Sequence, residues 1–238
     1  MKTPQDHIEF YKEQEQIFTN GLVYCQNLTE DKLYLSIFNI EQIFICNLMI
    51  GLIEWRINQN PKLQLIKAIT HFEKELSKLK ELEDYKKFQN PFLIITANYF
   101  AYLCNQECNL VINPLVTKDE HYNIEYYLFN SISKSSNFKP EIETSFYKIN
   151  KSKKHKLVFD SYTNYFQILE AFENNENLNN KIEIAESLFT KRANNSYYSN
   201  CHEIDGGYLN NNLVIDFRLA VILKKIDYKG NSIHKWNW

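Results

Sequence analysis

The sequence predicts an all-α protein: an irregular multi-helix bundle, or an α-solenoid-like packing of helix pairs, around a buried C-terminal helix at residues 212–225. Apolar residues recur three and four positions apart along most of the chain, which is the spacing of one helix face. The 238 residues include only five Gly and five Pro, whereas the tight turns of an all-β protein consume both. Residues 212–225 are apolar nearly all round, which is typical of a helix inside a protein.

The length allows one large domain or two small ones, each with a sizeable core. We expect one helical domain over residues 1–238, or two subdomains, 1–108 and 119–238. The segment between these subdomains contains Pro114 and predicts a loop or a short extended piece.

Four helices are predicted in the first half of the chain. The first, 6–28, is weakly amphipathic. The second, 29–58, has the strongest apolar face and begins with Thr29 as its N-cap, followed by two acidic residues. The third, 61–87, begins at the proline of Asn60-Pro61, and the fourth, 92–105, follows Asn90-Pro91. Each pair marks a boundary because the residue before a proline avoids the helical region.

The second half predicts a short helix at 121–133, a polar connection at 135–152, and a helix pair at 156–174 and 177–194. No repeat of fixed period is present, so a regular repeat array is not predicted. The chain then reaches the helix at 212–225.

This last predicted helix carries Asp216 in its first turn and two lysines in its last turn, the arrangement that the helix dipole favours. Three asparagines, 210–212, are the N-cap candidates. Gly230 is the predicted stop.

Charge and cysteine content exclude several classes of protein. The net charge of −2 provides no field for nucleic acid or an anionic membrane, so neither is an expected partner. Five irregularly spaced cysteines predict reduced thiols rather than a disulfide framework.

The longest apolar run, 43–53, is far shorter than the roughly 20 residues that span a bilayer. Residues 1–16 contain no apolar signal core. A cytoplasmic protein is expected.

Common catalytic and cofactor motifs are absent: the sequence contains no glycine-rich phosphate loop, no nucleophile elbow, no CxxC pair and no HExxH. Cys201, His202, Asp205 and His234 are all able to bind zinc, but their spacing matches no common zinc site. We therefore expect no metal, no cofactor and no enzymatic activity.

Charged residues gather near the C-terminus, and two interpretations of them are open. They are Arg192, Glu203, Asp205, Asp216, Arg218 and His234. In an enzyme such groups serve as acid, base and anion clamp. Alternatively, Asp216 and Arg218 are tolerated at the start of a buried helix because they form pairs. We favour the second interpretation. The lysine cluster within 148–156 is interpreted as a solvated loop, and Trp236 as an aromatic that docks the chain end.

Four short motifs in this region carry a family resemblance. They are Leu188-Phe189-x-Lys191-Arg192, Gly206-Gly207, Asp216-Phe217-Arg218-Leu219-Ala220-x-Ile222 and Ser232-Ile233-His234-x-Trp236. Together they resemble the C-terminal end of immunity protein 49, a mostly α-helical group from bacterial polymorphic-toxin systems. The resemblance covers about a fifth of the chain.

The resemblance implies a cytoplasmic antitoxin that binds the C-terminal domain of a cognate toxin, delivered by contact or by a type VI secretion machine. It would block the toxin's active site or its access to substrate. The motif residues would form the scaffold: Arg192, Gly206, Gly207, Asp216, Arg218, His234 and Trp236. A polar loop is the expected toxin-binding surface, through Tyr197, Tyr198, Glu203 and Tyr208, because loops on a rigid scaffold commonly carry recognition.

Two other functions remain open. One is a helical adaptor that binds other proteins. The other is a hydrolase or nuclease that uses Asp205, Asp216, Arg218 and His234.

Overall fold

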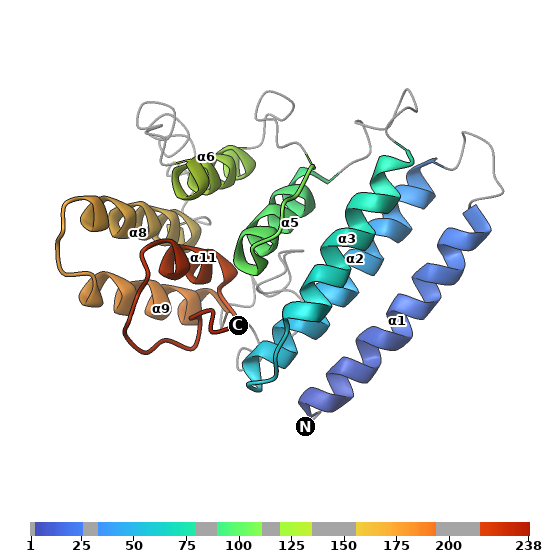
Figure 1. Cartoon of the computed structure of the whole chain (residues 1–238), viewed down its shortest axis with the longest axis horizontal. Coiled ribbons are helices and arrows are strands. Elements are labelled where there is room, and N and C mark those ends of the chain that lie inside the picture. Colours follow the sequence, from blue (N-terminus) through green and yellow to red (C-terminus); the bar gives the residue numbers. More distant parts are fainter. Residues whose placement is uncertain (1–2, 26–32, 80–89, 111–119, 135–155, 194–214) are drawn as a thin grey trace. The chain divides into compact units, whose positions relative to one another are not determined.

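The computed structural model describes residues 3–25, 33–79, 90–110, 120–134, 156–193 and 215–238, and these contain eight helices and no strand (Figure 1). The all-α prediction is confirmed. The chain divides into two compact units, Met1–Leu110 with Trp238, and Val111–Asn237.

In its described residues the first unit contains α1 (Pro4–Cys25), α2 (Leu33–Arg56), α3 (Lys62–Ser77) and α5 (Pro91–Cys104). Each of the first three helices lies against the next one in the chain, and α5 packs on α3 (Figure 1). The predicted third helix, 61–87, ends earlier than expected, since α3 stops at Ser77. Residues 80–87 lie outside the described part, as does the predicted N-cap Thr29.

The core of this unit forms around α2, which is buried over most of its circumference. Phe44 on α2 stacks on Phe72 of α3 with ring centroids 4.1 Å apart. Gly51 on α2 lies so close to Leu65 that an added Cβ would come within 2.7 Å of that side chain. A glycine at this position therefore permits the close approach of α2 and α3.

The apolar character of α2 also bears on membrane insertion. Among the described residues, α2 alone is long and apolar enough to cross a membrane, by length and composition. However, 72% of its most apolar window is buried inside the structure, and the core helix of a soluble protein passes the same test. The helix is therefore weak evidence for a membrane span.

The second unit contains α6 (Glu120–Lys134), α8 (Lys156–Glu173), α9 (Asn179–Ala193) and α11 (Phe217–Lys225). The pair α8 and α9 matches the helix pair predicted from the sequence. The short helix α11 contacts both α8 and α6. Every residue of α11 from Phe217 to Leu223 is buried, so the last helix does lie inside the unit.

The start of this last helix differs from the prediction. Ile215 and Asp216 are not helical, and α11 begins at Phe217 rather than near residue 212. Asp216 is itself the N-cap, because its side chain accepts a hydrogen bond from the backbone N–H of Leu219. The asparagines proposed as N-caps, 210–212, lie outside the described residues.

Four helices end in the same way, with an asparagine or aspartate in the left-handed conformation. These residues are Asn58 after α2, Asn105 after α5, Asn175 after α8 and Asp227 after α11, with φ between 50° and 59°. In each case the backbone N–H of the following residue donates to a carbonyl five positions back, the bond of a Schellman motif. Asp227, and not the predicted Gly230, therefore stops α11.

Candidate functional site

Four of the motif residues meet in the second unit and are buried there. Arg192 lies at the end of α9, Asp216 and Arg218 at the start of α11, and His234 in the tail that follows it. Their exposed fractions are 3%, 0%, 7% and 1%. Two carboxylates and two guanidiniums are present, because Glu125 of α6 joins the group with 1% exposure. We call Glu125, Tyr162, Tyr165, Arg192, Asp216, Arg218 and His234 the buried network.

Asp216 is the centre of the buried network. Its Oδ1 accepts from the N–H of Leu219 at 3.1 Å and thereby caps α11. Its Oδ2 accepts from the hydroxyl of Tyr165 on α8 at 2.5 Å. The guanidinium of Arg192 lies 3.9 Å from the same oxygen, and donates to the Tyr165 hydroxyl at 3.5 Å. One carboxylate thus links α8, α9 and α11.

Electrostatics keep Tyr165 in its donating form. Complete burial raises the pKa of Tyr165 well above its ordinary value of 10, and the neighbouring charge of Asp216 raises it further. The two arginines act in the opposite direction. The tyrosine therefore remains protonated and supplies the hydrogen that Asp216 needs.

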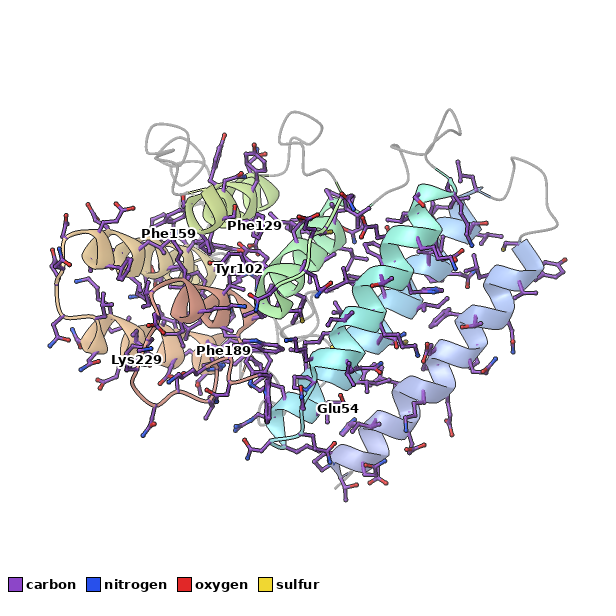
Figure 2. All side chains as sticks on the ribbon, in the orientation of Figure 1. Glu54, Tyr102, Phe129, Phe159, Phe189 and Lys229 are labelled. Carbon is purple, nitrogen blue, oxygen red and sulfur yellow. The ribbon has the colours of Figure 1, made fainter. Side chains whose placement is uncertain are left out.

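His234 fastens the C-terminal tail to the start of α11. Its Nδ1 accepts from the backbone N–H of Asp216 at 3.0 Å, so this nitrogen carries no proton in the arrangement. The imidazole and the ring of Phe189 on α9 pack in a T-shaped arrangement, with centroids 5.0 Å apart. Phe189 is labelled in Figure 2. The preceding Ser232 donates to Glu186 of α9 at 2.5 Å and accepts from the N–H of His234.

A second ion pair joins α11 to α6. Glu125 Oε1 accepts from Arg218 Nε, lies against Arg218 Nη2, and also accepts from the Tyr162 hydroxyl at 2.5 Å. The guanidinium of Arg218 lies over the ring of Phe217 at 4.6 Å from its centroid. Since both charges have left water, each is compensated by the other and by these hydrogen bonds and ring contacts.

This geometry supports a structural task for the buried network. The carboxylate of Asp216 is engaged on both oxygens, and Asp216 and His234 are closed to solvent. Asp216, Arg218 and His234 therefore do not face an open site in this arrangement. Asp205, which the hydrolase or nuclease hypothesis also needs, lies outside the described residues.

Several other predicted site residues fall outside the described part of the chain. They are Gly206 and Gly207 of the motif, the zinc-competent Cys201 and His202, and the proposed toxin-binding set Tyr197, Tyr198, Glu203 and Tyr208. Trp236 is partly buried in the tail. Over the residues that the structure describes, no three His, Cys, Asp or Glu side chains gather in a way that could hold a metal ion.

Sequence reasoning missed Glu125 as a member of the network, although a signal was present. Ile124, Leu128 and Ile132 form the buried stripe of α6, and Glu125 lies three residues before Leu128 and seven before Ile132. A carboxylate inside an apolar stripe needs a cationic partner when it is buried. That partner, Arg218, is 93 residues away in the chain, and no local spacing connects the two.

The first unit holds a carboxyl group with a strongly perturbed pKa. Burial raises the pKa of Glu41, on α2, from 4.5 to about 7, although a hydrogen bond from Asn90 acts to lower it. Glu41 Oε1 accepts from the Asn90 N–H at 2.8 Å, and Asn90 is the N-cap of α5. This hydrogen bond holds the start of α5 against α2, so the raised pKa of Glu41 is explained by the role of Glu41 in helix packing.

No known protein-family model matches this chain, and no match was found among curated proteins or solved structures.

Proposed function

We propose that this protein is an immunity protein, which binds a cognate secreted toxin domain in the cytoplasm and blocks its active site or its access to substrate. The observation that carries the proposal is the place of the motif residues. Arg192, Asp216, Arg218 and His234 are four of the seven scaffold residues that the family resemblance implies. They lie in one buried network, whose two ion pairs meet at the ring contact of Tyr162 with Tyr165.

A buried network suits a scaffold for binding better than it suits turnover. A catalytic group must reach its substrate, whereas Asp216 and His234 are enclosed. Removing one charge from a buried pair is strongly destabilising, so such residues are expected to stay the same across related scaffolds. Surface residues are then left to match one particular partner. An inhibitor of a single cognate toxin requires this combination of a constrained buried scaffold and a variable binding surface.

The test is co-expression of this chain with the toxin domain encoded beside it, in a bacterial host that the toxin kills. We expect survival, together with a complex that remains associated during size-exclusion chromatography and has the summed mass of the two chains. A toxin domain from an unrelated system is the control, and it should still kill.

Two results would contradict the proposal. Death of the co-expressing cells would remove the immunity function. Survival without any complex would instead indicate an enzyme that reverses the damage, and would return attention to the charged residues near the C-terminus.

A further inference from the structure

The helix α1 has two opposite faces. Ile8, Tyr11, Leu22 and Cys25 are buried on the face toward α2. On the other face, Phe10, Ile17 and Tyr24 follow one another at intervals of seven residues, which places them along one side of the helix. Their exposed fractions are 40%, 59% and 68%. Figure 2 shows side chains projecting from the side of α1 that faces away from α2.

Phe10, Ile17 and Tyr24 form a row of large apolar side chains on this side of α1. Val23 is also 56% exposed, but it lies about 100° around the helix from Tyr24 and is outside this row. Isolated exposed apolar residues are ordinary, but several along one side of a helix indicate a surface that binds another protein. The helix is 22 residues long, about 33 Å at 1.5 Å per residue. This length suffices for an extended contact.

The same face is acidic. Asp6, Glu9 and Glu13 are exposed among or beside the apolar positions. Lys12 pairs with Glu9 at 3.2 Å, and Lys67 of α3 lies 3.4 Å from Glu15. Over the whole of α1 there are four carboxylates (these three and Glu15) against one lysine, a net charge of −3. The complete chain has a net charge of −2, so the remainder sums to +1. Negative charge is therefore concentrated on α1.

We infer that this outer face of α1 is the surface on which the cognate toxin docks, and that the toxin presents there a basic surface with apolar side chains among its lysines and arginines. The inference rests on the proposed function. Apolar contacts supply affinity, while opposite charges guide the approach and exclude wrong partners. A second copy of this chain fits the face less well, because it would bring another helix of net charge −3.

Charge reversal tests the electrostatic part. In the double variant Glu9→Lys/Glu13→Lys, we expect the Kd for the purified neighbouring toxin domain to rise at least about 30-fold, mostly through slower association. The matched control is Glu173→Lys/Glu183→Lys, which makes the same change of net charge at exposed positions of the second unit. The control should leave the Kd within about twofold. Wild-type binding should also weaken as salt rises from about 0.05 to 0.5 M.

Loss of an exposed apolar side chain tests whether apolar contacts of α1 supply affinity for the toxin. Ile17→Asn should raise the Kd at least about tenfold, whereas Ile184→Asn, at another exposed isoleucine, should not. Both Ile17 and Ile184 are on the surface, so thermal unfolding of each variant should match that of the wild type. A shared loss of folding would show in the circular dichroism of the variants before any binding is measured.

The outcomes separate the two proposals. If the wild-type chain forms no complex with the toxin domain, the proposed function fails and this inference fails with it. If wild type binds but the α1 variants bind equally well, the toxin docks elsewhere and only the inference is overturned. A wild-type chain that sediments as a dimer, and as a monomer after Ile17→Asn, would make this face a self-interface and would likewise overturn it.

Discussion

Removing the carboxylate of Glu125 should destabilise the second unit more than any surface change does. In Glu125→Leu, the guanidinium of Arg218, only 7% exposed, loses the carboxylate that pairs with it, and the Tyr162 hydroxyl loses its hydrogen bond to the same carboxylate. Removing one partner of a buried ion pair costs about 3–5 kcal/mol. The lost hydrogen bond of the Tyr162 hydroxyl adds about 1 kcal/mol or more. The sum approaches the total stability of a typical domain, about 5–15 kcal/mol.

The reasoning is tested most sharply by removing the partners as well. The triple variant Glu125→Leu/Arg218→Met/Tyr162→Phe lacks both charges of this ion pair and also the tyrosine hydroxyl. We expect it to be more stable than the single variant by at least about 2 kcal/mol, because replacing a complete buried pair by apolar side chains is often nearly neutral.

Urea unfolding followed by circular dichroism at 222 nm measures both variants, and hydrogen exchange of the α11 amides locates the effect in the second unit. Two results would refute the argument. One is a Glu125→Leu protein within about 1 kcal/mol of wild type, since it would place Glu125 in water. The other is a triple variant less stable than Glu125→Leu, since the three changes would then simply add.

Three further predictions concern other elements. Asp216→Ala should cost more than Asp216→Asn in urea unfolding, since asparagine retains a capping oxygen and a cap is typically worth about 1 kcal/mol. Asn175→Gly should raise the free energy of unfolding by up to about 1 kcal/mol and Asn175→Ala should lower it, because φ is 56° there. The raised pKa of Glu41, about 7, means that the folded protein holds a proton that the unfolded chain has released above pH 4.5. Stability should thus fall by up to about 3 kcal/mol as pH rises from 4.5 to 7, and Glu41→Gln should flatten this profile in urea titrations.

The helices of the first unit were predictable because their signals are local. Asn90-Pro91 supplies both the N-cap and a proline at the first helical position, and α5 begins there. The periodic apolar face of α2 requires no knowledge of its neighbours. The end of α2 is different: Asn58 takes the left-handed conformation that a glycine usually takes. In a chain with 29 asparagines and five glycines, asparagine alone does not mark a helix end.

The start of α11 shows why the charged residues were harder to place. Apolar periodicity continues back to residue 213, so it predicts a longer helix than the one beginning at Phe217. The helix begins only at Phe217 because the Asp216 side chain bonds to Leu219 and Tyr165, and because the N–H of Asp216 donates to His234. Two of these partners are distant in sequence. The charge of Asp216 is evident from the sequence. Its role as the N-cap is not, because that role depends on contacts with three other residues.

The geometry of the buried network also explains why a motif can identify a scaffold without locating its binding surface. The buried motif side chains make their contacts inward: Arg192 to Asp216 and Tyr165, Arg218 to Glu125, and His234 to the N–H of Asp216. Substituting one of them takes away an interaction that offsets the desolvation of its buried partner. These residues are therefore constrained together. Glu9, Glu13 and Ile17 on the outer face of α1 are exposed, so substituting them removes no partner from a buried ion pair. If recognition resides there, related proteins should share the buried network and differ at Glu9, Glu13 and Ile17. Transplanting those three side chains from a relative with another cognate toxin should then change which toxin is bound, while leaving the unfolding midpoint unchanged.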